Sequence, residues 1–147
     1  MINIIKTNLL TQHTEAIVNP VNCVGVMGKG LALAFKTAYP ENYHLYKEAC
    51  NRNEVIPGKM FVYNTGSTPK YIINFPTKRH WKDNSYLKDI KNGLIDLVVV
   101  IDQYKIQSIT IPALGCGLGG LDWKIVFPLI KDALKDLAVE INVIEPF

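Results

Sequence analysis

Residues 19–30, with the sequence Asn19-Pro-Val-Asn-Cys-Val-Gly-Val-Met-Gly-Lys-Gly30, form a glycine-bearing loop between two apolar segments. The strand-like run Ala16–Val18 precedes the loop, and an apolar helical pattern begins at Leu31. A strand, a glycine loop and a helix in this order present backbone N–H groups and a helix N-terminus to an anion. The glycines also permit close approach of the backbone, which a side chain would obstruct. The segment predicts either an anion-binding loop or an ordinary strand–helix connection.

A second glycine loop, Pro112-Ala-Leu-Gly-Cys-Gly-Leu-Gly-Gly-Leu-Asp-Trp123, follows the apolar run Ile109–Ile111. It lacks the Gly-Lys-Ser/Thr ending of a P-loop, so hydrolysis of a nucleoside triphosphate has little support. It also lies at the wrong end of the chain for a Rossmann fingerprint. Two such loops at strand ends could hold the two phosphates of one diphosphate ligand, and the alternative is a pair of tight turns.

The rest of the chain alternates between strand-like and helical patterns. Strands are predicted at residues 2–6, 16–21, 59–64, 71–75, 108–113 and 139–144, and helices at 31–39, at 41–51, after Ser85 and after Asp122. Strands that alternate with amphipathic helices indicate an α/β layered fold with a largely parallel central sheet. The short connections within 52–75 predict some antiparallel pairing, so the sheet is expected to be mixed.

Several local signals set the expected boundaries of these elements. The strand at 71–75 should end at Pro76, followed by a basic and aromatic loop over 76–84. Ser85 and Asp122 are predicted as helix N-caps. Gly93 should weaken its helix by about 1 kcal/mol relative to Ala. Pro128 lies too deep for a first turn, so the sequence leaves the start of the last helix open or predicts a kink in it.

The composition is that of one soluble globular domain spanning residues 1–147. A hydrophobic fraction of 48% and a charged fraction of 20% are ordinary values for such a domain. Three cysteines without a framework spacing, and no signal-peptide pattern, predict reduced thiols and a cytoplasmic protein. No apolar run is long enough to span a bilayer. The net charge of +3 is a mild bias towards polyanionic partners.

The two glycine loops, together with Tyr71-Ile-Ile-Asn-Phe-Pro-Thr-Lys-Arg-His-Trp81, resemble macrodomains, the ADP-ribose-binding fold. The likeness covers essentially the whole chain. It is strongest to the branch that contains the terminal ADP-ribose glycohydrolase and the DarG antitoxins. The DarG antitoxins remove ADP-ribose from thymidine in single-stranded DNA. The resemblance implies a three-layer α/β/α sandwich with the ligand across the carboxyl ends of the strands.

The same resemblance implies a set of ADP-ribose-binding residues. Asn8 stands where many macrodomains have an acid that contacts the adenine amino group, and an amide oxygen can still accept that hydrogen bond. Asn22 matches the position that touches the distal ribose. Gly115 to Gly120 would hold the diphosphate, with Gly28 to Gly30 on its other side. The full predicted set is Asn8, Leu9, Asn22, Gly25, Val26, Met27, Gly28, Lys29, Gly30, Pro76, Thr77, Gly115, Cys116, Gly117, Leu118, Gly119 and Gly120.

Lys78 matches the catalytic lysine of this branch. A lysine with a depressed pKa can attack or polarise an anomeric carbon, and Arg79 beside it could supply the depression. One departure is that the human glycohydrolase has an aspartate where this chain has Gly119. The resemblance therefore does not imply a complete lysine–aspartate mechanism for this chain. Asp122 is expected to cap a helix and not to replace the missing aspartate.

The segment around Lys78 also suggests contact with nucleic acid. An aromatic side chain among basic ones suits a stacked base and a phosphate backbone, which makes Arg79, His80, Trp81 and Lys82 candidates. The alternative is that Trp81 packs and His80 is exposed. Neither His13 nor His44 has partners at metal-ligand spacing, and Cys116 lacks the pattern of a nucleophile, so no metal site and no cofactor are expected.

The leading functional hypothesis is a glycohydrolase that removes ADP-ribose from a modified base, most plausibly thymidine in single-stranded DNA, with Lys78 acting at the anomeric carbon. A second hypothesis is a reader that binds ADP-ribose without turnover, which Gly119 keeps open. A third is hydrolysis of ADP-ribose esters on protein carboxylates. The expected partners are ADP-ribose, ADP-ribosylated single-stranded DNA and a cognate ADP-ribosyltransferase toxin. The protein is expected to act as a monomer away from membranes, either free-standing or as one domain of a longer chain.

Overall fold

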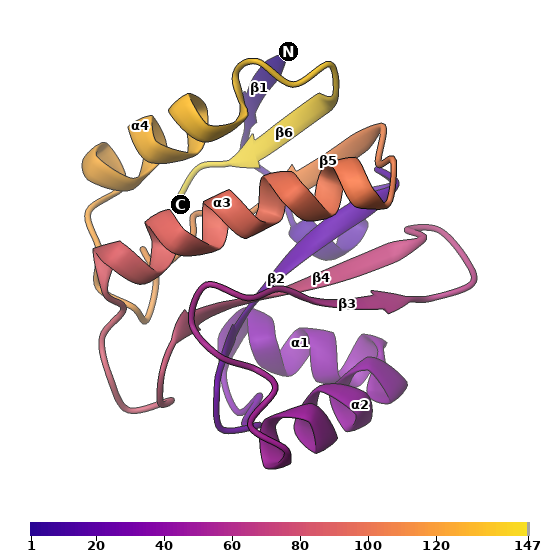
Figure 1. Ribbon diagram of the computed structural model, residues 1–147, viewed down its shortest axis with the longest axis vertical. Helices are drawn as coiled ribbons and strands as arrows, with labels where there is room; N and C mark the ends of the chain where they lie inside the picture. Colours follow the sequence, from indigo (N-terminus) through magenta and orange to yellow (C-terminus); the bar gives the residue numbers. More distant parts are fainter. Residues whose placement is uncertain (147) are drawn as a thin grey trace.

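The computed structural model describes residues 1–146 and has a six-stranded mixed sheet in the order β1-β6-β5-β2-β4-β3 (Figure 1). The strands are β1 (Ile2–Ile5), β2 (Ala16–Asn22), β3 (Phe61–Asn64), β4 (Tyr71–Lys78), β5 (Ser108–Ile111) and β6 (Glu140–Ile144). Five of them run parallel, and β3 pairs with β4 antiparallel. The carboxyl ends of the five parallel strands therefore meet at one edge of the sheet.

Helices cover both faces of the sheet, which gives the expected three layers. The helices are α1 (Gly30–Ala38), α2 (Pro40–Asn51), α3 (Leu87–Gln103) and α4 (Trp123–Leu134), with a short 3-10 turn at Leu9–Thr11. Figure 1 shows α3 and α4 together on one side of the sheet, while α1 and α2 lie near β2 and β4 on the other. The predicted α/β/α fold with a mixed, largely parallel sheet is confirmed.

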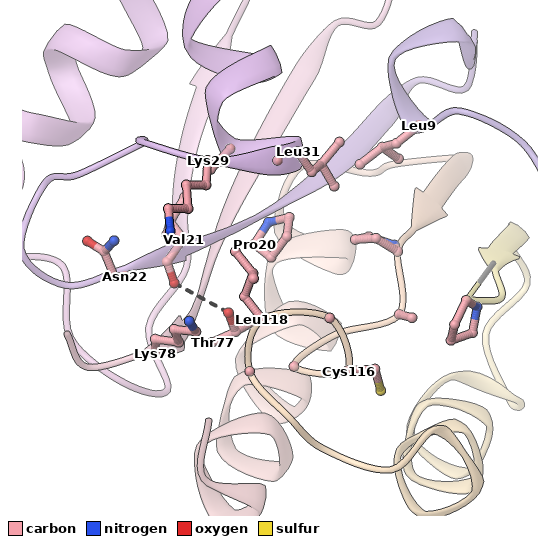
Figure 2. A pocket seen from close by; sticks show the side chains of 18 of the residues that line it. Leu9, Pro20, Val21, Asn22, Lys29, Leu31, Thr77, Lys78, Cys116 and Leu118 are labelled. Carbon is pink, nitrogen blue, oxygen red and sulfur yellow. Dashed lines mark hydrogen bonds between the residues drawn. The ribbon is translucent and has the colours of Figure 1, made fainter. Parts of the chain in front are cut away.

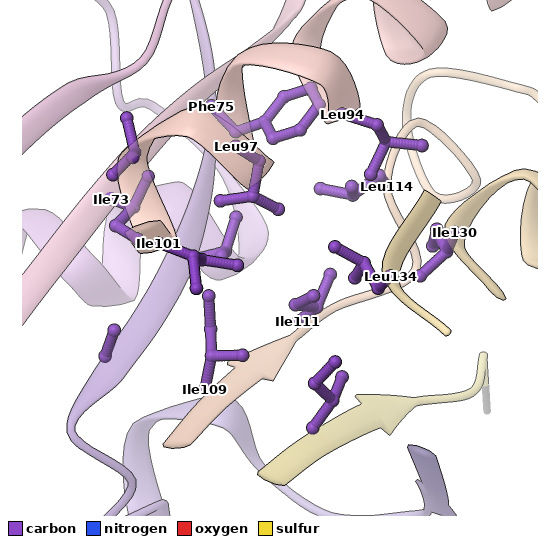
Figure 3. Packing of buried hydrophobic residues seen from close by; sticks show 14 of the residues in the cluster. Ile73, Phe75, Leu94, Leu97, Ile101, Ile109, Ile111, Leu114, Ile130 and Leu134 are labelled. Atoms are coloured by element: carbon purple, nitrogen blue, oxygen red, sulfur yellow. The ribbon is translucent and has the colours of Figure 1, made fainter. Parts of the chain in front are cut away.

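Two apolar clusters separate the layers. The larger one packs α3 and α4 on the sheet, and Figure 3 shows Leu94, Leu97 and Ile130 from these helices around Ile109 and Ile111 of β5. The smaller one packs α1 and α2 on the opposite face. Strands covered on both faces read as continuous apolar runs rather than as alternating ones, which is why the run at the start of β2 is a strong strand signal. Over residues 1–146, no helix has the length and apolar character needed to cross a membrane.

The fourth strand is longer than the sequence predicts. It continues through Pro76 to Lys78, so the prediction that the strand ends before Pro76 and that a loop begins there is wrong. Proline normally interrupts a sheet because it cannot donate to the ladder. Here β3 pairs with β4 only as far as Asn74, and the register between β2 and β4 shifts after Val21. The proline therefore lies beside an open edge and a bulge, where such residues are tolerated.

Helix α3 begins one residue later than the sequence predicts. Its N-cap position is Tyr86, without a side-chain capping bond, so the assignment of Ser85 as N-cap is wrong. Ser85 is instead buried, and its N–H donates to the carbonyl of Gly119 at 2.9 Å. The cap of α4 is as predicted, because the carboxylate of Asp122 accepts a hydrogen bond from the N–H of Lys124 at 2.9 Å. That helix starts at residue 123 and runs on through Pro128.

Gly93 has a packing role that the sequence does not reveal. A Cβ at this position would lie far inside van der Waals contact with the ring of Phe75, which is fully buried on β4. The glycine therefore allows the helix to approach the sheet closely. Its cost in helix propensity is offset by the packing of the aromatic ring, so Gly93 stabilises the fold rather than weakening it.

We expect Gly93→Ala to lower the free energy of unfolding by about 1–3 kcal/mol, because the overlap with Phe75 outweighs the gain in helix propensity. Urea unfolding followed by circular dichroism measures the change. Phe75→Leu in the Gly93→Ala background opens space for the added methyl group, so the double variant should lose less than the sum of the two single losses. A Gly93→Ala protein more stable than wild type would contradict this packing role.

Candidate functional site

A large pocket lies along the edge where the parallel strands end (Figure 2). Its volume is about 1290 Å³, and it extends from the segments after β1 and β6 to the end of β4. The two glycine loops line it between these ends; residues 23–29 are named loop 1 and residues 112–122 loop 2. Ligands in α/β sheets bind at such carboxyl edges. The pocket is large enough for an extended ligand of dinucleotide size.

Loop 1 is fixed by the side chain of Asn22. Its Oδ1 accepts hydrogen bonds from the N–H groups of Val24 (3.1 Å) and Val26 (3.3 Å), and its Nδ2 donates to the carbonyl of Val26 (2.8 Å). The hydroxyl of Tyr46 lies 2.7 Å from the backbone carbonyl oxygen of Asn22 and 2.8 Å from the same Oδ1, and it donates its single hydrogen to one of these two oxygens. The amide oxygen is therefore used within the protein. The second hydrogen of Nδ2 remains for a ligand in the pocket, which Asn22 lines.

Burial keeps the groups beneath loop 1 protonated. It raises the pKa of the Tyr46 phenol far above its ordinary value and that of the Cys23 thiol to about 11. Tyr46 is fully buried on α2. A phenol with a raised pKa stays a hydrogen-bond donor throughout the physiological range, so Tyr46 holds Asn22 independently of pH.

Loop 2 folds back on itself and on the start of α3. The N–H of Leu121 donates to the carbonyl of Gly115 at 2.9 Å, and both Gly115 (φ +74°) and Gly120 (φ +77°) have positive φ. A Cβ on Gly119 would lie 2.5 Å from the Gly115 carbonyl oxygen and closer still to Ser85 Oγ. Position 119 thus has no room for a side chain, and an acid there would require a different loop.

Lys78 ends β4 directly beside Asn22. The bulge in the β2–β4 ladder pairs Val21 with Pro76 and Asn22 with Lys78, and Thr77 Oγ donates to the Val21 carbonyl at 3.5 Å. Figure 2 shows Asn22, Lys29 and Lys78 gathered on one side of the pocket, near Leu118 of loop 2. Lys78 Nζ also donates to the carbonyl of Trp81 at 3.4 Å.

The four nucleic-acid candidates fall into two groups. Trp81 and Lys82 line the pocket, and Trp81 is 47% exposed. Arg79 and His80 are not among the lining residues. The guanidinium of Arg79 forms two hydrogen bonds with the buried carboxylate of Asp89, at 3.0 and 3.1 Å, which raises the pKa of Arg79. Its charge is therefore engaged by Asp89 on α3 and not directed at Lys78.

Asn8 lies at the opposite end of the pocket. Its Oδ1 accepts a hydrogen bond from the N–H of Leu10 at 2.9 Å and caps the short 3-10 turn. Within residues 1–146, the other lone pair of this oxygen and the amide N–H₂ form no hydrogen bond with the protein. Leu9 is buried and contributes an apolar wall beside it.

Four of the predicted binding residues do not line the pocket. Gly25 and Met27 are buried on the inner side of loop 1, where Gly25 packs against Lys47 and Cys50 of α2. Pro76 is buried within β4, one residue before the pocket. Gly120 turns the chain out of loop 2 towards Asn84. These residues lie behind the lining of the pocket, and their role as ligand contacts stays a prediction.

The other thirteen predicted binding residues and Lys78 all line the pocket. Sequence reasoning missed a further set, which is Thr7, Pro20, Val21, Leu31, Ala32, Pro112, Ala113, Ile144, Glu145 and Pro146. Most of these residues are close sequence neighbours of a predicted binding residue. The others lie at or just after the end of a parallel strand. The strand ends themselves were therefore the available signal. Across residues 1–146, no group of three or more His, Cys, Asp or Glu side chains could hold a metal ion.

Residues 18–130 match the family described as Macro domain. The chain is a macrodomain. It is 48% identical over 149 residues to the DNA ADP-ribosyl glycohydrolase of Thermus aquaticus, an alignment that covers 99% of this chain and 41% of that protein. The structure resembles the macrodomain of Mycobacterium tuberculosis DarG with a TM-score of 0.98 and 51% identity, over 100% of this chain and 99% of that one.

A further solved relative contains a ligand. Thermosipho africanus DarTG in complex with ADP-ribose matches 99% of this macrodomain and 42% of its own chain, with a TM-score of 0.94 and 35% identity. The present chain spans about two-fifths of the length of the curated relatives it matches, 41% in Thermus aquaticus and 38% in Mycobacterium tuberculosis. The likeness therefore concerns the macrodomain part of those longer proteins.

The cramped position of Gly119 predicts a stability effect. We expect Gly119→Ala to lower the free energy of unfolding of the macrodomain by about 1–3 kcal/mol, because the new methyl group overlaps Gly115 and Ser85. Gly117→Ala is the matched control, since a Cβ at position 117 of the same loop meets no protein atom within 4 Å. Thermal unfolding measures both. Equal effects of the two variants would contradict the packing argument.

Cys116 predicts a pH-dependent reactivity at the pocket wall. Burial raises the pKa of its thiol to about 11, so the thiol is neutral at pH 7 and the reactive thiolate appears as pH rises towards that value. Alkylation of Cys116 by iodoacetamide, followed by mass spectrometry, should accelerate roughly tenfold per pH unit between pH 8 and 10. Fast labelling at pH 7 with a plateau near pH 8.5 would contradict the raised pKa.

Proposed function

We propose that this macrodomain binds ADP-ribose and removes it from a modified DNA base, thymidine in single-stranded DNA. The observation that carries the proposal is the position of Lys78 beside Asn22, at one end of a pocket that crosses five strand ends. The names of the Thermus aquaticus and Mycobacterium tuberculosis relatives, both DNA ADP-ribosyl glycohydrolases, support the reaction. The ADP-ribose complex of Thermosipho africanus DarTG supports the ligand.

The diphosphate of ADP-ribose fits between the two loops. Within the described residues, the N–H groups of Gly117, Leu118 and Gly119 form no hydrogen bond inside the protein. On the other side, the first N–H groups of α1 at Gly30 and Leu31 are free because they begin a helix. Backbone donors on both sides and a helix N-terminus are the features that stabilise phosphate groups. Lys29, at the N-cap of α1, adds a positive charge there.

The adenine end is assigned to the segments after β1 and β6. Asn8 can donate through its amide N–H₂ and accept through the remaining lone pair of Oδ1, which matches the mixed donor and acceptor edge of adenine. Glu145 is the one carboxylate among the residues that line the pocket, and it lies next to β1 because its N–H donates to the carbonyl of Ile5 at 3.0 Å. A carboxylate there accepts a hydrogen bond from the exocyclic amine of adenine.

With adenine at that end, the distal ribose reaches Asn22 and Lys78. The free hydrogen of Asn22 Nδ2 holds a ribose hydroxyl. Lys78, as the free amine, forms a bond to the anomeric carbon as the bond to the base breaks, and the leaving base takes up a proton from water. A water molecule then hydrolyses the lysine adduct, which releases ADP-ribose and restores the amine. Because Gly119 leaves no space for an acid, and Asp122 of loop 2 caps α4 and does not line the pocket, a loop-2 carboxylate does not assist. Lys78 therefore acts without the aspartate partner that the human glycohydrolase has.

The absence of that acid also favours a second candidate function, a reader that binds ADP-ribose without turnover. The pocket and both loops serve this function equally well, and only Lys78 distinguishes the two. Release of ADP-ribose from protein carboxylates is the third outcome that the same pocket allows. We further propose a cognate ADP-ribosyltransferase as functional partner, since one relative is a DNA ADP-ribosyl transferase–DNA ADP-ribosyl glycohydrolase fusion protein.

The proposal predicts that Lys78→Ala abolishes turnover while leaving ADP-ribose bound. Release of ADP-ribose from a thymidine-ADP-ribosylated single-stranded oligonucleotide should fall more than about 100-fold, because the group at the anomeric carbon is lost. The affinity for free ADP-ribose, measured by calorimetry, should change only a few-fold. Lys124→Ala is the control, since this exposed lysine on α4 does not line the pocket and should leave both values unchanged.

Three other outcomes would redirect the assignment. Full turnover by Lys78→Ala would remove this residue from the mechanism. Tight ADP-ribose binding by wild type, with no release from thymidine or from a carboxylate ester, would establish the reader. Release from the ester alone would place the leaving group on protein.

A further inference from the structure

We infer that the turn His80–Asp83 receives the leaving base and its DNA strand, with Trp81 stacking on the base and Lys82 contacting a backbone phosphate. This inference rests on the proposed function. It deepens it by naming a planar base on a polyanionic strand as the group that the pocket accepts beyond the distal ribose. The arguments come from the rigidity of the turn, the exposure of the indole and the distribution of charge.

The turn has a defined conformation. The N–H of Asp83 donates to the carbonyl of His80 at 3.1 Å, which closes the turn, and the N–H of Lys82 donates to His80 Nδ1 at 3.2 Å. His80 and Trp81 lie with ring centroids 5.6 Å apart. The imidazole therefore supports the backbone and one side of the indole. A preformed turn presents its side chains to a ligand at a low cost in conformational entropy.

Arg79 anchors this turn to α3. Its two hydrogen bonds reach Asp89, of which only 2% is exposed, and its guanidinium carbon lies 4.7 Å from the ring centroid of Tyr86. A planar guanidinium that forms two parallel bonds with a carboxylate fixes direction as well as distance. Arg79 is thus a positioning residue for Trp81 rather than a phosphate ligand.

Trp81 is placed next to the reacting centre. Its carbonyl accepts the hydrogen bond from Lys78 Nζ at 3.4 Å, and its side chain lines the pocket with 47% of its surface exposed. Leu118 of loop 2, which is 67% exposed, lines the same pocket. An exposed indole beside the catalytic lysine offers a stacking surface, and every nucleobase has a face that can use it.

The charges around this end of the pocket favour a polyanion. Lys29, Lys78 and Lys82 line it, whereas Glu145, the single acidic side chain that lines the pocket among residues 1–146, lies at the far end after β6. Lys82 Nζ lies over the Trp81 ring, 5.0 Å from its centroid, so a base that stacks on this face takes the place of the ammonium group and leaves it free to contact a phosphate of the same strand. An ADP-ribosylated protein carboxylate would use neither the stacking surface nor this extra charge.

The test compares three ligands: an oligonucleotide with ADP-ribosylated thymidine, the ADP-ribosylated thymidine nucleoside, and free ADP-ribose. Trp81→Leu should lower kcat/KM at least tenfold for both thymidine substrates and change the calorimetric affinity for ADP-ribose less than threefold. Trp81→Phe should restore most of the loss, because it returns an aromatic face. Lys82→Ala should reduce kcat/KM for the oligonucleotide at least fivefold more than for the nucleoside. The Lys82→Ala variant should also depend less on salt: the magnitude of the negative slope of log(kcat/KM) against log[salt] should fall by about one.

The outcomes separate this inference from the proposed function. If wild type releases ADP-ribose from thymidine and Trp81→Leu remains fully active, the base site is wrong while the glycohydrolase assignment stands. Equal losses of turnover and ADP-ribose affinity in Trp81→Leu would show that the indole only shapes the pocket, and would also overturn the inference. If wild type releases nothing from either thymidine substrate, the proposed function fails and the base site fails with it. Lys124→Ala serves again as the control for general effects of removing a lysine.

Discussion

The parallel pairing of β2 with β4 is the constraint on which the site depends. It brings together two segments that are more than fifty residues apart in the sequence, and its bulge after Val21 sets Asn22 directly beside Lys78. Buried amides fix this pairing from within: Asn19 Nδ2 donates to Asn74 Oδ1 at 3.0 Å, and Asn74 Nδ2 donates to Asn42 Oδ1 on α2 at 2.8 Å. All three side chains are fully buried. In a low-dielectric interior an unpaired amide is costly, so this network favours one register over its alternatives.

The second half of the site depends on a different contact. Loop 2 begins after β5, across β2 from β4, and it would be free to move if only its glycines determined its shape. The backbone hydrogen bond between Ser85 and Gly119 joins it to the segment that leads into α3, the helix that also holds Arg79 through Asp89. One helix thus positions both loop 2 and the turn around Trp81. Loop 2, which is proposed to face the phosphates, and the turn around Trp81, which is proposed to face the base, are therefore both held by α3. They follow different strands of the sheet.

The sequence predicts those parts of the structure that depend on local patterns. The strand before loop 1, the Asp122 cap and both glycine loops carry their signal within a few residues, and the structure confirms them. The parts that could not be predicted depend on neighbours distant in the sequence. Pro76 predicts the end of a strand, because the sequence does not reveal the bulge beside it. Gly93 predicts a destabilised helix, because the sequence does not reveal that Phe75 packs against it. Met27 is predicted as a contact residue from its place in loop 1, yet its side chain is buried in the smaller apolar cluster.

The chemistry of the pocket follows from what the fold leaves unpaired. Of the basic residues in the segment 78–82, Arg79 is bound to a buried carboxylate, while the Lys78 ammonium touches only a carbonyl and the Lys82 ammonium lies over an indole. A carbonyl or an aromatic face leaves the positive charge available to a ligand, whereas a bidentate carboxylate engages it. The same fold leaves no room for an acid at position 119, and Asp122, the carboxylate that loop 2 does contain, caps α4. This end of the pocket thus carries a positive field. Under the proposed function, that field suits a leaving group on a phosphate-bearing strand better than an isolated protein carboxylate.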